Sequence, residues 1–227
     1  MRILSLFLVI LFFSCSSAKN EKSQAVSTKE TSKVDSKAIK HFSIQNLGES
    51  YLIEIASPFV GANFSERYVL YPREGEKPQL DSVTHYIPYP IESIAITSTT
   101  HVGFLSVIDG LDYIKAANNM DWVYDEAFHQ RVQEGKIVSI GQRDLNKESM
   151  VKAELDVVLS YAIDLASYQE IKRLRDLGQT VVLISEFMEQ DPLNKAAWLK
   201  VIALLLGKEK EADKYLQEIS FKYDSLK

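Results

Sequence analysis

Residues 91–119 of this chain, IESIAITSTTHVGFLSVIDGLDYIKAANN, decide how the rest is organised. The stretch opens with apolar residues at Ile91 and at 94–96, as a buried β-strand does, and turns polar at 97–101. Apolar residues then return close to a helical period, at Val102, Leu105, Ile108 and Leu111. The pattern therefore predicts a strand, a polar turn and a helix that Ser98 or Thr99 can cap. Because such turns gather at the carboxyl ends of strands in open α/β sheets, where ligands bind, we expect any ligand here.

Downstream of this stretch, segments typical of strands alternate with segments typical of helices. Strands are expected at 136–140, 155–160 and 180–184, with a short strand or turn at 121–124, and helices at 125–133, 146–153 and 164–177. Strands joined by helices of roughly 8–15 residues form βαβ units. The fold class is therefore expected to be α/β, with a Rossmann-like, mainly parallel sheet covered on both faces.

The segment before this alternation has a different pattern. Residues 42–55 predict a hairpin that turns near Gly48, and a third strand follows at 67–71. Residues 74–90 contain prolines and are expected to be extended. An N-terminal antiparallel hairpin section is therefore expected in front of the parallel sheet.

Two helices are expected at the end of the chain. The first follows Asp191, is apolar nearly all round with Trp198 in the core, and ends at Gly207. The second, at 208–227, is amphipathic. The stripe of apolar residues on this second helix is expected to be covered by further chain or by another chain.

Composition argues against several classes of function. The 227 residues carry a net charge of −5, which argues against nucleic acid as a partner, because phosphate binding needs a basic patch. Four histidines and one cysteine leave little room for a metal cluster, and no HExxH, Walker, GxGxxG or GxSxG motif is found. We expect no resident metal, no cofactor and no catalytic residue.

The N-terminus predicts export. An apolar run of about eleven residues at 3–13 follows Arg2 and is too short to span a membrane, so residues 1–14 are interpreted as a signal peptide. Cys15 comes next and resembles the lipidated cysteine of a lipobox; ordinary secretion with an incidental cysteine is the alternative. Residues 15–40 are polar and are interpreted as the lipidated cysteine and a flexible tether, which places the protein in the cell envelope or periplasm, anchored to a membrane.

A family resemblance covers residues 68–216. The segments that carry it are, in order, YVLYPREGEKP, IPYPIESIAITSTTHVGFLSVIDG, VKAELDVVLSY, LRDLGQTVVLISEF and DPLNKAAWLKVIALLLGKEKEADKYL. They resemble the iron-siderophore/cobalamin class of ABC-transporter substrate-binding proteins. The resemblance implies two Rossmann-like lobes joined by a long helix, of which residues 41–207 are the N-terminal lobe and 208–227 the start of the bridging helix. The absence of a second lobe is interpreted as truncation, with a single-lobe relative as the alternative.

The resemblance also implies where a ligand binds. In the family, loops at the carboxyl ends of the strands line the cleft, and the matching positions here are Ser98, Thr99, Thr100, His101, Asn118, Asn119, Tyr161, Glu186 and Phe187. Hydroxyls at a helix N-terminus suit anionic groups, and aromatic rings offer flat apolar contact. Helix capping is the alternative for 98–100, and packing in the fold is the alternative for His101 and Tyr161.

A second implied site docks the permease. Members of the class present a glutamate on each lobe to arginines of the membrane permease, but Tyr168 stands near that position here. Glu170 or Asp164 is the candidate replacement, against the alternative of ordinary solvated charges.

The sequence thus predicts a lipid-anchored binding component of an ABC importer that captures a ferric siderophore, haem or cobalamin for a permease. One alternative is an enzyme resembling metal chelatases, with His101 handling the metal. Another is a single-lobe surface lipoprotein that pairs with another chain through its terminal helix.

Overall fold

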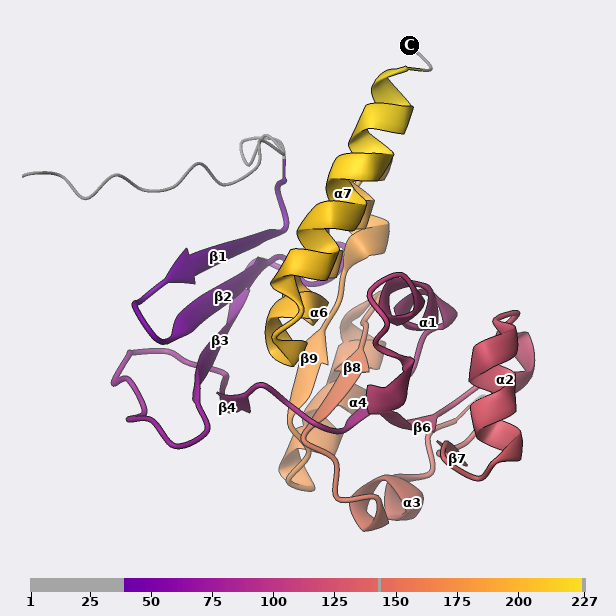
Figure 1. The fold of residues 1–227 in the computed structure, drawn as a ribbon. Coiled ribbons are helices and arrows are strands. Elements are labelled where there is room, and N and C mark those ends of the chain that lie inside the picture. Colours follow the sequence, from indigo (N-terminus) through magenta and orange to yellow (C-terminus); the bar gives the residue numbers. More distant parts are fainter. Residues whose placement is uncertain (1–38, 143, 226–227) are drawn as a thin grey trace, which may run out of the picture. The chain divides into compact units, whose positions relative to one another are not determined.

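The computed structural model describes residues 39–142 and 144–225, all within the structural unit Ser32–Lys227. The predicted signal peptide, Cys15 and nearly all of the tether lie outside the described residues. Two sheets form within them, one of order β1-β2-β3-β4 and one of order β7-β6-β5-β8-β9 (Figure 1). Across the part of the chain that the structure describes, none of the helices combines the length and apolar character that crossing a bilayer requires.

The first sheet contains the N-terminal strands β1 (Phe42–Asn46), β2 (Tyr51–Ala56), β3 (Ser65–Pro72) and β4 (His85–Tyr89). β1 and β2 form the predicted antiparallel hairpin, and β3 pairs antiparallel with β2. The hairpin turn holds Gly48 at φ +96°, a backbone conformation that glycine adopts without steric cost. β4 lies in the segment expected only to be extended, and it pairs parallel with β3, so the sheet has one parallel edge strand.

The second sheet is the predicted parallel sheet. Its strands are β5 (Ile94–Ile96), β6 (Ile114–Ala117), β7 (Val138–Ser139), β8 (Val157–Ser160) and β9 (Val181–Leu183), all mutually parallel. Every residue of β5, β8 and β9 is buried, as in a sheet covered on both faces. The strand order reverses between β5 and β8, which makes this position the topological switch point of the sheet.

One part of the secondary-structure prediction is wrong. The helix after β5, α1 (Thr99–Ser106), ends before the apolar spacing does, and a strand, β6, follows within the predicted helical region. The apolar residues of the short helix α1 and of the short strand β6 happen to have a nearly helical spacing when they are taken together. Hydrophobic periodicity alone therefore cannot distinguish a helix followed by a strand from one longer helix. Residues 120–122 form a 3-10 turn, η2 (Met120–Trp122), in agreement with the turn that was one of the two predictions for 121–124, whereas β7 is shorter than predicted.

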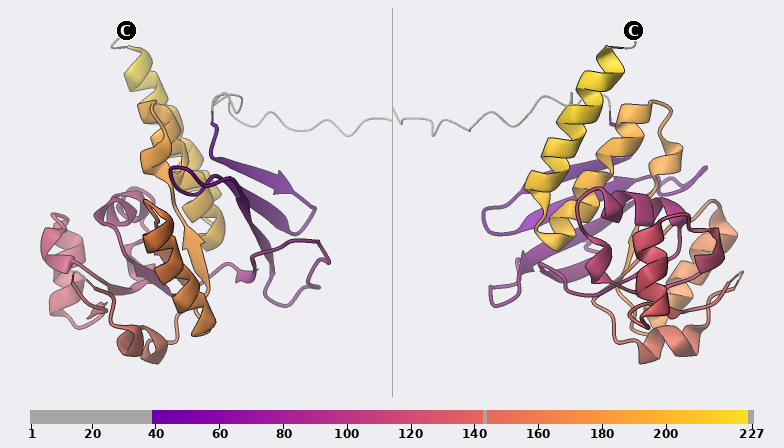
Figure 2. Two further views of the ribbon diagram at one scale, coloured as in Figure 1. Left: turned by 180° about the vertical axis from the view of Figure 1, so that it is seen from behind. Right: turned by 45° about the vertical axis from the view of Figure 1, so that its right-hand side comes forward.

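Helices cover both faces of the parallel sheet. α1 and α4 (Leu165–Asp176) lie on opposite faces, as the front and rear views show (Figures 1 and 2). The crossover helices α2 (Glu126–Gln133) and α3 (Lys147–Lys152) begin at capping residues. Asp125 accepts a hydrogen bond from the backbone N–H of Phe128 at 2.9 Å, and Asn146 accepts one from the backbone N–H of Ser149 at 3.0 Å.

The C-terminal section contains α5 (Pro192–Ala197), α6 (Leu199–Leu206) and α7 (Glu209–Asp224), followed in Figure 1 from orange to yellow. Trp198, between α5 and α6, is fully buried, as predicted. On α7, Ala212 and Leu216 are buried against the core, whereas Phe221 near its end is exposed. The core of this chain therefore covers the first part of the apolar stripe on α7, which was expected to be covered by further chain or by another chain.

A buried ionic cluster joins the first sheet to the second. Glu66 on β3 is 1% exposed and accepts hydrogen bonds from Arg175 on α4 at 2.6 and 2.7 Å. The hydroxyls of Tyr68 and Tyr168 also donate to this carboxylate, and Arg175 donates to the carbonyl of Val181 at 3.0 Å. Burial alone would raise the pKa of Glu66, but the hydrogen bonds and charge of Arg175 hold it below its usual value. We call Glu66, Tyr68, Tyr168 and Arg175 the buried ionic cluster.

Candidate functional site

The loops predicted to bind a ligand all leave the same edge of the parallel sheet. Because the strands are mutually parallel, their carboxyl ends meet at one edge, which we call the carboxyl edge. Residues 97–100 follow β5, residues 118–119 follow β6, Tyr161 follows β8, and residues 184–187 follow β9. The tertiary structure thus brings together residues that lie up to about 90 positions apart in the sequence, a span that only the pairing of strands can close.

The polar turn after β5 is held to the neighbouring strand. The Thr97 hydroxyl donates to the hydroxyl of Ser160 at 3.0 Å, across the switch point between β5 and β8. Ser98 is the N-cap of α1, as predicted: its hydroxyl accepts from the backbone N–H of Thr100 at 3.3 Å and lies 2.7 Å from the Thr100 hydroxyl. Ser98 is half-buried, and Thr99 and Thr100 are exposed. Capping therefore leaves these hydroxyls at the surface.

Glu186 lies beside this turn, in the 3-10 turn η3 (Glu186–Met188) that follows β9. It is 8% exposed, and its Oε2 atom is buried without a hydrogen-bond partner among the described residues. Burial raises the pKa of this carboxyl above its usual value, although hydrogen bonding by the Thr100 side chain acts in the opposite direction. The structure thus connects Thr100 to Glu186.

Tyr161 and Phe187 form an aromatic pair at the same edge. Their ring centroids are 6.3 Å apart in an edge-to-face arrangement, and both side chains are partly exposed. The pair offers flat apolar surface next to the hydroxyls of the turn after β5.

His101 differs from the other predicted residues. Its side chain is 0% exposed, and both ring nitrogens lack a partner among the described residues. Burial lowers its pKa to about 3, so the ring is neutral at physiological pH. The ring is therefore packed in the fold, as the alternative for this residue held, and it offers no surface to a ligand in this conformation.

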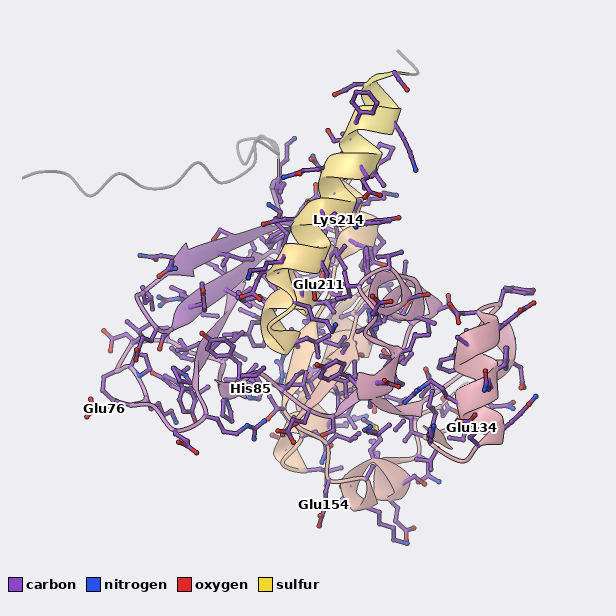
Figure 3. The ribbon with its side chains drawn as sticks, viewed as in Figure 1. Glu76, His85, Glu134, Glu154, Glu211 and Lys214 are labelled. Atoms are coloured by element: carbon purple, nitrogen blue, oxygen red, sulfur yellow. The ribbon has the colours of Figure 1, made fainter. Side chains whose placement is uncertain are left out.

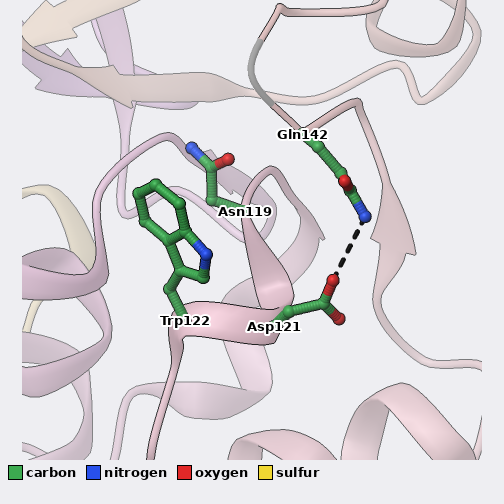
Figure 4. Close-up of a pocket in the computed structure, with 4 residues that line it drawn as sticks. All are labelled: Asn119, Asp121, Trp122 and Gln142. Atoms are coloured by element: carbon green, nitrogen blue, oxygen red, sulfur yellow. Dashed lines mark hydrogen bonds between the residues drawn. The ribbon is translucent and has the colours of Figure 1, made fainter.

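A pocket of about 400 Å³ lies farther along the carboxyl edge, and it is lined by Asn119, Asp121, Trp122 and Gln142 (Figure 4). Asn119 and the η2 turn follow β6, and Gln142 follows β7. The Gln142 amide donates to the Asp121 carboxylate at 3.1 Å. The Trp122 indole is 70% exposed, so the pocket has one large flat apolar side chain among polar groups.

The two predicted asparagines have different surroundings. Asn119 adopts the left-handed conformation at φ 49°, and its backbone N–H donates to the carbonyl of Gly141 at 3.2 Å. This bond ties the β6 and β7 loops that form the pocket. Asn118 is half-buried beside the same loops and donates weakly to the carbonyl of Gln142 at 3.4 Å.

Sequence reasoning missed Asp121, Trp122 and Gln142 as site residues. It assigned 121–124 to a short strand or turn and named no site residue there. Because β6 was hidden inside the predicted helix, the site positions after it came from the family resemblance alone, which included Asn118 and Asn119 but none of the residues at 120–122. An exposed tryptophan following two asparagines at the end of a strand is the signal that could have found them.

The predicted docking residues both have partners within this chain. Asp164 caps α4, accepting from the backbone N–H of Ser167 at 2.8 Å, and Glu170 pairs with Lys147 at 3.3 Å and with Arg173. Both remain solvent-exposed, so neither contact removes them from the surface. Docking by either residue remains a prediction.

The described residues hold no group of three or more histidine, cysteine, aspartate or glutamate side chains placed to bind a metal ion. What the carboxyl edge does offer is hydroxyls, amides, two carboxylates and aromatic rings. Such a surface can bind and orient a molecule through hydrogen bonds and flat apolar contact.

Comparisons with known proteins support the fold. No family model matches the chain. The sequence is 25% identical over 141 residues to an uncharacterised lipoprotein of Methanocaldococcus jannaschii, covering 59% of this chain and 34% of that protein.

Among solved structures, the chain is similar to the triscatecholate siderophore binding protein FeuA from Bacillus subtilis, complexed with ferri-bacillibactin. The TM-score is 0.50 with 20% identity, and the match covers 66% of this chain and 50% of that chain. A possible iron-binding (periplasmic solute-binding) protein from Staphylococcus epidermidis matches with a TM-score of 0.48 and 20% identity over 60% of this chain and 50% of that chain. The chain thus spans between a third and a half of the length of these proteins. The resemblance inferred from the sequence is confirmed for the fold, which is that of one lobe of a siderophore-binding protein.

Proposed function

We propose that this chain, with the fold of one lobe of a siderophore-binding protein, captures a metal chelate outside the cytoplasmic membrane for delivery to an ABC permease. The chelate class is the one that the sequence resemblance implies, namely a ferric siderophore, haem or cobalamin. No covalent chemistry is required of the protein, since its task is to hold a ligand and release it.

The observation that carries this proposal is the pocket at the carboxyl edge of the parallel sheet. Its volume of about 400 Å³ lies within the range of small-molecule sites. Open α/β sheets bind ligands at this edge, because the loops there bring polar groups from several strands to one place. The exposed Trp122 ring gives the pocket the flat apolar surface that a macrocyclic or aromatic chelate can cover.

The other residues of the edge contribute contacts beside the pocket. The hydroxyls of Ser98 and Thr100 remain at the surface after capping α1, and Tyr161 and Phe187 form an apolar wall next to them. A ligand larger than the pocket would rest on these side chains. Binding there removes apolar area from water, which contributes roughly 25 cal/mol per Å².

Trp122 and Tyr124 provide a matched test. Tyr124 is 96% exposed and lies two residues from Trp122, but it is not among the residues that line the pocket. Isothermal titration of the chain with a ferric hydroxamate, a ferric catecholate, haemin and cyanocobalamin should show binding of at least one. Trp122→Ala should weaken that binding about tenfold or more, because aromatic side chains buried by a ligand often contribute much of the binding free energy. Tyr124→Ala should leave the binding unchanged. Absence of binding to all four chelates would reject the proposal.

The enzyme alternative depended on His101 as an accessible metal-handling base. The buried ring of His101 cannot meet a substrate at the carboxyl edge in this conformation. We therefore propose binding rather than metal insertion.

Anchoring through Cys15 is part of the same proposal. The relative from Methanocaldococcus jannaschii is described as a lipoprotein, which supports a lipid anchor here. A Cys15→Ser variant should move the protein from the membrane fraction to the soluble fraction. Unchanged fractionation would reject this part of the proposal and leave chelate binding intact.

A further inference from the structure

We infer that the carboxyl edge of this chain selects a chelate without net negative charge that offers hydrogen-bond donors, and disfavours polyanionic chelates. The inference rests on the proposed function and names the ligand class of the same site. It is drawn from the charges that the structure places around the pocket and beside the turn after β5.

Among the described residues that line the pocket, Asp121 is the one with a charged side chain, and its charge is negative. Two of its lining residues, Asn119 and Gln142, are neutral amides that donate and accept hydrogen bonds, and Trp122 donates only through its indole N–H. Asp121 is exposed, and from the described residues it accepts one hydrogen bond, donated by Gln142. Since a carboxylate has about four acceptor positions, Asp121 retains capacity for amide, hydroxyl or ammonium donors of a ligand.

Glu186 adds a second carboxyl at the same edge. It is buried next to the exposed Thr100, and its Oε2 atom has no partner in the described part of the chain. This oxygen is shielded from solvent in this conformation, so Glu186 acts on a ligand at the carboxyl edge through its charge and not through a hydrogen bond from that atom. An anionic ligand group nearby would meet like-charge repulsion from this carboxylate.

Positive charge is scarce around these groups. Among the described residues, which do not include Arg143 next to Gln142, no lysine or arginine lines the pocket. Lys195 on α5 acts on Glu186 through its charge, but its side chain is exposed on a helix outside the pocket. A complex with several negative charges would therefore meet the Asp121 carboxylate in the pocket, with no cation among the described lining residues to compensate it, and Glu186 farther along the same edge. Specificity by repulsion of this kind is common at binding sites.

The test compares chelates of similar size and different charge. The chain is titrated at low and high salt with a neutral ferric tris-hydroxamate, a ferric hydroxamate that bears a free ammonium group, and a trianionic ferric tris-catecholate. The first two should bind about tenfold or more tightly than the third, and added salt should narrow the difference because it screens exposed charges.

Asp121→Asn is the variant that isolates the charge. It should strengthen tris-catecholate binding about threefold to fivefold and weaken binding of the ammonium-bearing chelate by a similar factor. Glu154→Gln is the matched control, because Glu154 is exposed and precedes β8 at the opposite edge of the sheet (Figure 3). This control should change neither affinity.

Two outcomes overturn the inference, and they differ in what they say of the proposed function. Tightest binding of the tris-catecholate, unaffected by Asp121→Asn, would reject the charge selection and leave a chelate receptor. Absence of binding to all three chelates would reject the receptor and this inference with it.

Discussion

Two buried glutamates lie in different parts of the molecule, one in the buried ionic cluster that holds the fold together and one at the carboxyl edge, where we propose that a chelate binds. Glu66, in the buried ionic cluster, accepts hydrogen bonds from Arg175 and two tyrosine hydroxyls, and its pKa is lowered. Glu186, at the carboxyl edge, has Thr100 beside it and one oxygen without a partner in the described part of the chain, and its pKa is raised. Both side chains are almost completely removed from water.

The comparison shows that burial alone does not tell what a charged residue does. A carboxylate whose hydrogen bonds are satisfied within the chain fixes the positions of the elements that carry its partners. A carboxyl that is buried and under-satisfied costs stability, and such groups cluster at functional sites.

The largest effect is expected from Arg175→Met. Removal of the guanidinium leaves the carboxylate of Glu66 buried without a counter-charge, which should lower the free energy of unfolding by about 3–5 kcal/mol in urea denaturation. The control Arg173→Met removes an exposed partner of Glu170 and should cost at most about 0.5 kcal/mol. Replacing Glu66 and Arg175 together by Leu and Met should recover much of the loss. Equal stability of the two single variants would show that the buried ionic cluster does not hold the sheets.

The next effect concerns acid stability and His101, which is buried beneath the carboxyl edge. Burial lowers the pKa of His101 to about 3 in the folded state, whereas the unfolded chain takes up this proton near pH 6.5. Because the unfolded state therefore binds more protons between these two pH values, the stability of the fold falls as the pH drops from about 6.5 toward 3. Between pH 6.5 and 4.5 this residue should account for about 2 kcal/mol of lost stability.

His101→Leu should remove this share of the pH dependence, whatever its effect on stability at pH 7. His85, on β4 (Figure 3), has a pKa lowered to about 4 by burial and acts in the same direction, so His85→Leu is the comparison variant. An identical slope of stability against pH in His101→Leu and the parent chain would contradict the burial of the histidine.

A smaller effect of opposite sign should separate the two glutamates. At pH 7 the raised pKa of Glu186 means that its ionised form destabilises the fold, so Glu186→Gln should stabilise it, by about 1 kcal/mol, the scale of one unmade hydrogen bond. The gain should disappear in acid, below the unfolded pKa, where the carboxyl is neutral in both states.

Glu66→Gln should instead destabilise the fold at pH 7. The lowered pKa of Glu66 means that its ionised form stabilises the folded state, and this stabilisation is lost as the pH falls through the pKa of the folded state. Thermal unfolding of both variants at pH 7 and pH 4 checks the signs. Stabilisation by Glu66→Gln, or destabilisation by Glu186→Gln, at pH 7 would break the comparison.

The smallest effect on stability is expected from Trp122→Ala. The indole is largely exposed, so its loss should change the free energy of unfolding by less than about 0.5 kcal/mol while chelate binding falls. A large loss of stability would place Trp122 in the structural part of the molecule rather than in the site. Chemical denaturation beside the titration described above distinguishes these results.

Much of the fold was predictable because its signals are local. The apolar run before Ser98 predicted β5, Ser98 and Asp191 were recognised as helix caps, and the alternation of strands and helices predicted the parallel sheet. The loop residues Ser98, Thr100, Tyr161 and Phe187 were placed at one edge by the family resemblance. Strand periodicity, capping and turn chemistry each depend on a few neighbouring residues, and a sequence displays them directly.

The missed features depend on residues far apart. β6 is a strand because its backbone pairs with β5 and β7, although its apolar residues also fit a helical period. The same pairing placed Trp122 and Asp121 in a loop beside Gln142, where they line the pocket.

The sequence by itself determined most of the order of the elements, the Ser98 cap that begins α1 and the polar turn at the end of β5. Only the tertiary structure decided that His101 is buried, that Glu66 meets Arg175 across 109 positions of sequence, and that Glu186 is left with an unpartnered oxygen among the described residues. The physical reason is that burial and hydrogen-bond satisfaction depend on which distant groups reach a side chain after the sheets pack. Local sequence carries no record of that.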